Sequence, residues 1–316
     1  MVRPSNSARN VVLLALAGNV LVAITKIVAA AVTGSAAMVS EAVHSVVDTA
    51  NEGLLLLGYH QSTRRPDIIH PLGYGRELYF WSFIVALMVF ALGAGVSIYQ
   101  GIQHIVSPEP IEHVLVNYVV LALSFCCEAP SWLASKRKLD ASRGEMGYWE
   151  AIHRSKDPPT FVVLFEDSAA LIGIFIAAAG IYLSERLAMP VLDGVASLLI
   201  GLVLAGVAIV LARESKSLLI GERAAPHVMN DAVHLARSQR GVTNAEGTIT
   251  VQLAPDQIVV ALSVEFDEEL TARGIEDTVE HIEDRIQAAC PEIVTLFIKP
   301  QTHERFAAWK LKHFGN

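Results

Sequence analysis

The sequence predicts an α-helical membrane protein with six transmembrane helices, followed by a C-terminal α+β domain. Three observations support this class. The chain has 316 residues, of which 53% are hydrophobic and only 18% are charged, a composition that is unusual for a soluble protein. Its apolar residues gather in runs of about 20, the length of helix that crosses a hydrocarbon core of about 30 Å. No run of that length follows residue 212.

Six apolar runs are long enough to span a bilayer. They cover residues 11–32, 36–59, 78–105, 114–135, 161–183 and 191–212. We therefore divide the chain into a six-helix transmembrane domain, residues 1–213, and a smaller C-terminal domain, residues 214–316. The first run could be mistaken for a signal peptide, but its length favours a helix that is retained.

Positive charges predict the orientation, because short loops rich in Lys and Arg stay in the cytoplasm. On one side of the membrane lie Arg3, Arg9, Arg64, Arg65, Arg76 and the basic residues of the loop 136–156. The opposite connections contain only Arg186. We therefore expect an integral, multi-pass protein with both termini in the cytoplasm. The expected membrane is the bacterial inner membrane, and the equivalent side of an organelle membrane is the alternative.

The second apolar run carries His44 and Asp48 where a bilayer is expected. A spacing of four places both side chains on one helix face, so that an imidazole nitrogen and a carboxylate oxygen can reach one metal ion. Keeping an Asp at mid-membrane costs roughly 2.5 to 3.5 kcal/mol, so such groups usually line a pathway. The pair predicts a divalent-cation transporter, and a purely structural role is the alternative.

Glu41 and Asn51 extend this pair into one polar stripe at helical spacing. Because lipid offers no polar partner, the stripe must face other helices or a water-filled cavity. Glu41 and Asn51 are therefore weaker candidates for contact with the cation. Their alternatives are a place at the non-cytoplasmic water boundary for Glu41 and a packing or entrance role for Asn51.

Residues 70–77 read His-Pro-Leu-Gly-Tyr-Gly-Arg-Glu and lead into the third run. Together with a His four residues before an Asp in the second run, this segment resembles the cation diffusion facilitators, the zinc-transporter family. The resemblance covers nearly the whole chain. It implies six spans, a cation site built from the second and fifth spans, and a cytoplasmic ferredoxin-like domain that dimerises.

The resemblance also assigns ligands in the fifth span. Family members usually carry there a His or Asp four residues before an Asp, and Asp167 matches the second member of that pair. Val163 occupies the first position and cannot bind a metal. Glu166 and Asp167 together resemble a branch of the family with a Glu-Asp pair in this helix. The implied metal residues are His44, Asp48 and Asp167, with Glu166 or water in the fourth position; a proton-handling or helix-pairing role is the alternative for Glu166.

Three further positions match weaker sites of the family. Asp67 and His70 match ligands of a second cation in the loop after the second span, where Tyr74 replaces a histidine. The alternative is a Gly-rich turn that positions the third helix. Asp193 matches an Asp near the start of the sixth span. It is expected to cap a helix N-terminus or to interact with the helix dipole. The alternative is a role in an outer vestibule that attracts cations.

Two other ionisable residues within the runs call for partners. Lys26 lies about halfway along the first run, where an ammonium group is costly unless it is paired. We expect a structural pair with an acidic residue on a neighbouring helix, with snorkelling to the interface as the alternative. For Glu128 we expect a salt bridge with the basic cluster 136–138.

The C-terminal domain has a readable order of elements. We expect a helix over 225–239, strands over 248–253 and 258–266, a helix over 273–289 and a strand over 293–298. Helix, hairpin, helix and strand form a small α+β sandwich. By resemblance this domain dimerises, so a second copy of the chain is an expected partner.

These observations predict a transporter that exports divalent metal, zinc first, from the cytoplasm by proton antiport through alternating access. His44 can be a ligand when neutral and a proton carrier when charged. The expected partners are the metal ion, protons and membrane lipid, with no cofactor and no nucleic acid. A manganese- or iron-selective transporter, a non-transporting dimeric scaffold and a metal sensor are the alternatives. A membrane-embedded enzyme is disfavoured because no His-Glu-x-x-His motif or nucleophile-plus-base motif occurs in any span.

Overall fold

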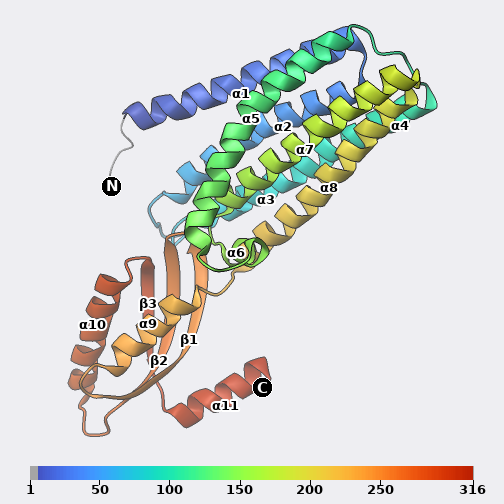
Figure 1. Ribbon diagram of the computed structural model, residues 1–316. Helices are drawn as coiled ribbons and strands as arrows, with labels where there is room; N and C mark the ends of the chain where they lie inside the picture. Colours follow the sequence, from blue (N-terminus) through green and yellow to red (C-terminus); the bar gives the residue numbers. More distant parts are fainter. Residues whose placement is uncertain (1–5, 316) are drawn as a thin grey trace. The chain divides into compact units, whose positions relative to one another are not determined.

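The computed structural model describes residues 6–315, apart from the side chains of residues 6–17, 247, 248 and 314. Arg3 and the side chain of Arg9 therefore lie outside the described part. The chain divides into two compact units, which are described separately (Figure 1). The first comprises Met1–Gln61 and Glu77–Lys216, and the second comprises Ser62–Arg76 and Ser217–Asn316. The loop between the second and third runs therefore groups with the C-terminal elements. The division at residue 213 into a transmembrane domain and a C-terminal domain stays a prediction.

The first unit is helical. Its elements are α1 (Asn6–Thr33), α2 (Ala36–Ser62), α3 (Glu77–Met88), the π-helix η1 (Val89–Ala94), α4 (Gly95–Val106), α5 (Val114–Arg143), α6 (Tyr148–Arg154), α7 (Pro158–Leu187) and α8 (Val191–Ile220). The continuous stretch from α3 through η1 to α4 forms one long helical segment. The short helix α6 lies in the connection after α5 and was not predicted.

Four helical segments are long and apolar enough to cross a membrane, judged on the described residues. They are Glu77–Val106, Val114–Arg143, Pro158–Leu187 and Val191–Ile220. In α1 the side chains are described only from Gly18, which leaves a shorter apolar segment, Gly18–Thr33. Helix α2 is long enough to span a membrane, with 27 residues, but its polar stripe lowers its mean hydropathy. Four of the six predicted spans are thus supported, and the first two stay predictions.

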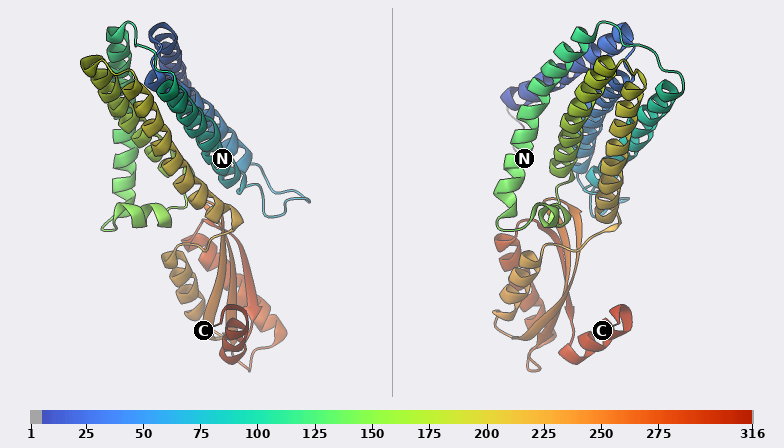
Figure 2. Two further views of the ribbon diagram at one scale, coloured as in Figure 1. Left: turned by 90° about the vertical axis from the view of Figure 1, so that its right-hand side faces the viewer. Right: turned by 45° about the vertical axis from the view of Figure 1, so that its right-hand side comes forward.

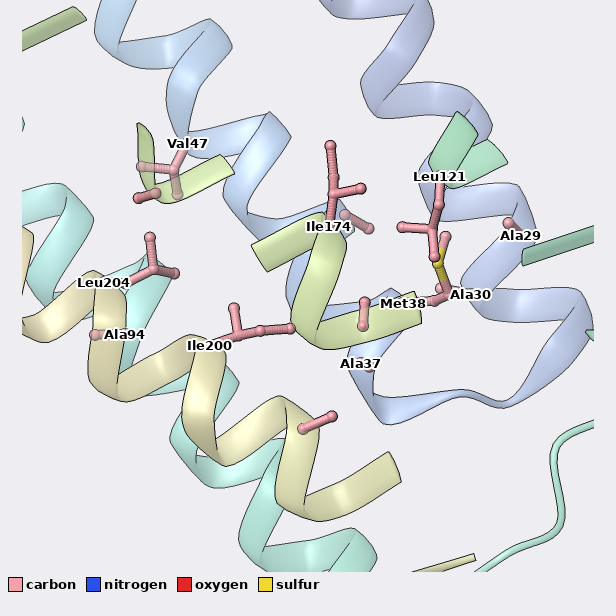
Figure 3. Close-up of a cluster of buried hydrophobic side chains, with 14 of the residues drawn as sticks. Ala29, Ala30, Ala37, Met38, Val47, Ala94, Leu121, Ile174, Ile200 and Leu204 are labelled. Carbon is pink, nitrogen blue, oxygen red and sulfur yellow. The ribbon is translucent and has the colours of Figure 1, made fainter. Parts of the chain in front are cut away.

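The core of the first unit is made of small and aliphatic residues from several helices. Figure 3 shows part of this cluster, in which Ala37 and Met38 of α2 lie close to Ile174 of α7 and Ile200 of α8. Small side chains allow helix backbones to approach closely, which compensates for the lack of a hydrophobic driving force in lipid. At Gly180 a side chain would collide with Ala196, so this glycine permits the side-by-side packing of α7 and α8 that is visible in Figure 1 and Figure 2.

The second unit contains a three-stranded sheet in the order β1-β2-β3. Strands β1 (Val242–Ala254) and β2 (Gln257–Phe266) form an antiparallel hairpin. Strand β3 (Ile293–Pro300) pairs with β2 in parallel, which is possible because α10 (Ala272–Ala289) provides the crossover between them. Helix α9 (Pro226–Arg237) and α10 pack their apolar faces against the sheet.

The predicted order of helix, hairpin, helix and strand is therefore found in this unit. Strand β1 begins six residues earlier than expected, at Val242. A further helix that was not predicted, α11 (His303–Phe314), follows β3. Its first turn is capped by Thr302, whose hydroxyl accepts a hydrogen bond from the backbone N–H of Arg305 at 3.5 Å.

Candidate cation site

A small cavity of about 50 Å³ lies among α1, α2, α5 and α7 of the first unit. Three of the four predicted ligand residues line it, namely Asp48 from α2 and Glu166 and Asp167 from α7. The remaining wall residues are Asn19, Val22, Ser45, Glu52, Cys127, Glu128, Ser131 and Val163. Carboxylates from three different helices therefore face one enclosed space in the membrane unit, and Val163 faces the same space as Asp167.

His44 lies one turn from Asp48 on α2, as the spacing predicts. Its side chain is buried, with 1% exposed, and its Nδ1 lies 3.4 Å from Oδ1 of Asp48. Within the described part of the chain, neither ring nitrogen of His44 nor Oδ1 of Asp48 has a hydrogen-bond partner. Because buried polar atoms are normally paired, these unpartnered atoms are the ones that a bound cation would satisfy.

The two predicted ligand carboxylates on α7 are each held by a neutral donor from a different helix. Asn51 donates a 2.6 Å hydrogen bond to Glu166, which links α2 to α7. Ser131 donates a 2.8 Å hydrogen bond to Asp167, which links α5 to α7. Asn51, a weaker candidate from the sequence, thus positions a predicted ligand and is buried beside it.

No group of three or more His, Cys, Asp or Glu side chains is arranged to hold a metal ion anywhere in the described residues. His44, Asp48, Glu166 and Asp167 are thus brought into one region without forming a closed ligand cage. Structural zinc sites close four ligands around the ion, whereas a site that must release its ion keeps an open position. The ligand assignment stays a prediction.

Glu41 does not line the cavity and pairs with a lysine of the same unit. Its carboxylate is completely buried and lies 3.1 Å from Nζ of Lys26 on α1. Lys26 also donates a 2.8 Å hydrogen bond to Ser45. The expected pairing of Lys26 with an acidic residue on a neighbouring helix is confirmed. The alternative place for Glu41 at the water boundary is wrong, because its side chain is completely buried and paired with Lys26. A buried ammonium group and a buried carboxylate must stay together in an apolar surrounding.

Glu128 does not pair with the basic cluster that follows it on α5. Its Oε1 lies 3.9 Å from Nζ of Lys26, and its side chain lines the cavity. Lys136 instead pairs with Asp140, at 2.7 Å. The expected salt bridge was wrong because eight residues of helix separate Glu128 from Lys136 by about 12 Å. Sequence reasoning therefore missed Glu128 as a residue of the cavity, although its place at mid-helix was a usable signal.

The loop between α2 and α3, in the second unit, gathers Asp67, His70 and Tyr74. Asp67 accepts hydrogen bonds from the backbone N–H groups of Ile69, at 2.9 Å, and His70, at 2.6 Å. The Tyr74 hydroxyl donates a 2.6 Å hydrogen bond to the other carboxylate oxygen of Asp67. This bond, together with the backbone N–H of His70, lowers the pKa of Asp67 to about 2. Nδ1 of His70 lies 3.4 Å from Asp67. The carboxylate thus holds a turn within the loop, which favours the alternative of a Gly-rich turn over a second cation site.

Asp193 caps a helix, but not the helix to which it belongs. It accepts hydrogen bonds from the Ser35 hydroxyl, at 2.8 Å, and from the backbone N–H of Ala36, at 2.5 Å. These groups form the start of α2, and Asp193 belongs to α8. A carboxylate at a helix N-terminus satisfies unpaired donors and balances the helix dipole. Asp193 therefore fixes one end of the helix that carries His44 and Asp48.

Comparisons with known proteins agree with this arrangement. Residues 12–220 match the family described as the cation efflux transmembrane domain. The mouse mitochondrial proton-coupled zinc antiporter SLC30A9 is 32% identical over 308 residues, which cover 97% of this chain and 53% of that protein. The Xenopus laevis protein of the same name is 34% identical over 266 residues, covering 84% of this chain and 48% of its own length.

A plant relative matches a shorter part of this chain. Metal tolerance protein C4 of Arabidopsis thaliana is 30% identical over 244 residues, which cover 77% of this chain and 53% of that protein. The chain spans about half the length of these curated relatives. The family match covers most of the chain and confirms the resemblance to the cation diffusion facilitators. This chain is an integral, multi-pass membrane protein that belongs to the cation efflux family, a family of transporters and not of enzymes.

Proposed function

We propose that this protein moves divalent cations, zinc before others, out of the cytoplasm in exchange for protons. The observation that carries the proposal is the cavity lined by Asp48, Glu166 and Asp167, with unpartnered His44 beside Asp48. Membership of the cation efflux family gives independent support. The relatives from mouse and Xenopus laevis are themselves named as proton-coupled zinc antiporters.

Zinc is the preferred cargo because imidazole and carboxylate groups are ligands that zinc accepts in tetrahedral sites. Manganese and ferrous iron prefer a larger share of oxygen ligands. The further carboxylates of the cavity, Glu52 and Glu128, could supply them. A manganese- or iron-selective transporter is therefore the second candidate.

Proton exchange follows from the chemistry of the ligands. A metal ion binds only deprotonated carboxylates and neutral imidazole, so each binding event releases protons, and each protonation favours release of the metal. His44 and the cavity carboxylates can therefore serve both cargoes in turn. Alternating access requires that α2 and α7, which carry the ligands, move relative to their neighbours, as the helices of transporters do.

The wider arrangement completes the proposal. Residues 1–213 provide six spans and the cation site, and residues 214–316 join two copies of the chain. The termini face the cytoplasm, in a bacterial inner membrane or the equivalent side of an organelle membrane, and lipid surrounds the helices. Asp67, His70 and Asp193 contribute turn and cap contacts in this scheme and no cation site.

Metal flux tests the proposal directly. The purified full-length chain is reconstituted in proteoliposomes that enclose a fluorescent indicator responsive to divalent transition metals, and it is challenged with zinc, manganese, iron and cobalt across a pH gradient. Asp48→Asn and Asp167→Asn should abolish flux, and the matched control Asp256→Asn, an exposed position in the β1–β2 turn, should not. A wild-type chain that binds metal without moving it would favour the scaffold or sensor alternatives.

A further inference from the structure

A single ammonium group lies directly behind the wall of the cation cavity. Lys26 is completely buried, and its Nζ lies 3.1 Å from Glu41, 2.8 Å from Ser45 and 3.9 Å from Glu128. Ser45 and Glu128 line the cavity, whereas Glu41 does not. Lys26 of α1 therefore joins a buried partner on α2 to a cavity carboxylate on α5.

Apart from Asp48, which faces His44, Glu128 is the least constrained carboxylate of the cavity. Glu52, Glu166 and Asp167 each accept a hydrogen bond from a neutral side chain, donated by Asn19, Asn51 and Ser131 respectively. The contact of Glu128 with Lys26, at 3.9 Å, is longer than a hydrogen bond. Its side chain is also 19% exposed, whereas that of Glu41 is completely buried. Glu128 can thus turn toward the cavity without breaking a hydrogen bond.

Charge explains why the ammonium group is held there. Five carboxylates line a cavity of about 50 Å³, and a low-dielectric surrounding makes their mutual repulsion strong. Lys26 supplies a fixed positive charge at the edge of this cluster. A divalent cation that enters the cavity attracts the same carboxylates, and Glu128 lies between the two positive charges.

We propose that Lys26 is an internal counter-cation that competes with the transported cation for Glu128. When the cavity holds no cation, the ammonium group holds Glu128 at the wall; when a cation enters, Glu128 turns toward it. Lys26 thereby weakens cation binding and favours release, which a transporter needs. The inference rests on the proposed function and adds Glu128 as a further cation-contacting residue.

Removing Lys26 alone would leave Glu41 buried without its counter-charge, a change that is strongly destabilising. The test therefore replaces both members with uncharged residues of similar size, Lys26→Met with Glu41→Gln. Zinc binding to the purified full-length chain is measured by isothermal titration calorimetry for the wild type, this double variant, Glu128→Gln, and the triple variant. Glu112→Gln, at an exposed carboxylate outside the cavity, is the matched control, and thermal unfolding checks that each variant is folded.

The double variant should bind zinc more tightly, roughly three- to tenfold, which is the usual size of coupling between contacting charged residues. Glu128→Gln should weaken binding, and in its presence the double replacement should have no further effect. An equal gain with and without Glu128, or unchanged binding in Glu128→Gln, would overturn the inference while leaving the proposed function intact. A wild type that neither binds nor moves zinc would instead overturn the proposed function itself.

Discussion

Asn51 on α2 donates a 2.6 Å hydrogen bond to Oε1 of Glu166 on α7, and both side chains are buried. The bond joins the two helices that carry the predicted ligands His44, Asp48 and Asp167. Movement of α2 against α7 must therefore keep this bond or break it at a cost. Asn51 acts on the site by holding Glu166. The polar stripe in the sequence is compatible with this role and equally with direct contact between Asn51 and the cation.

Asn51→Ala should destabilise the protein by about 1–3 kcal/mol, because Glu166 would remain buried without its donor. Thermal unfolding of the detergent-solubilised chain measures the effect, with Gln103→Ala at an exposed position of α4 as the control. An unfolding temperature equal to that of the wild type would show that Glu166 finds another donor or water.

Val163→His should add a ligand to the cavity. Val163 lies one turn before Asp167 and lines the same space, in the position where the family usually carries a His or Asp. We expect zinc to bind roughly tenfold more tightly or more, since a further nitrogen would help to close the coordination shell. Release should then slow, so that flux falls while affinity rises.

Calorimetry and zinc flux on the same protein separate these two effects. Leu164→His, the neighbouring position outside the cavity lining, serves as the control and should leave affinity unchanged. If Val163→His and Leu164→His behave alike, the cavity is not where the cation binds.

Asp193→Ala should destabilise the protein by about 0.5–2 kcal/mol, the usual cost of losing a helix N-cap. The start of α2 would lose the acceptor for Ser35 and Ala36. Asp193→Asn keeps an acceptor oxygen and should recover part of the loss. Thermal unfolding and zinc flux are compared for both variants; a stable Asp193→Asn protein with lost flux would instead support the vestibule that attracts cations.

Much of the architecture is contained in local sequence patterns. The apolar runs predict the helices, the spacing of four places His44 and Asp48 on one face, and alternation predicts the β1–β2 hairpin. Helix α11 was missed, although the helix-capping residue Thr302 precedes a segment with apolar residues at helical spacing, including Phe306. This signal was available and could have found it.

Contacts between distant residues could not be derived in the same way. Asp193 matched a helix start, but nothing local shows that it caps α2, which begins more than 150 residues earlier. Lys26 needed an acidic partner, yet Glu41, Glu52 and Glu128 were all available in neighbouring spans. Packing decides between them, because only the folded helices bring Glu41 within 3.1 Å and leave Glu128 at the cavity wall.

Tyr74→Phe should raise the pKa of Asp67 from about 2 toward 3.8, its ordinary value, because the Tyr74 hydrogen bond is the main cause that lowers it. A lowered carboxyl pKa stabilises the folded state at pH values above the unfolded pKa, and this stabilisation is lost as the pH falls through the folded pKa. The wild-type loop should therefore lose stability between about pH 4 and pH 2, and the variant should show less of this dependence.

Carbon-13 NMR of Asp carboxyl groups in the full-length chain measures the titration, with Asp67→Asn used to assign the signal. Tyr99→Phe, at an exposed position of α4, should leave the Asp67 titration unchanged, since the side-chain hydrogen bond that lowers the Asp67 pKa comes from Tyr74. If Asp67 still titrates near pH 2 in Tyr74→Phe, the backbone N–H groups of Ile69 and His70 alone hold the carboxylate, and the turn does not depend on the residue that replaces a histidine here.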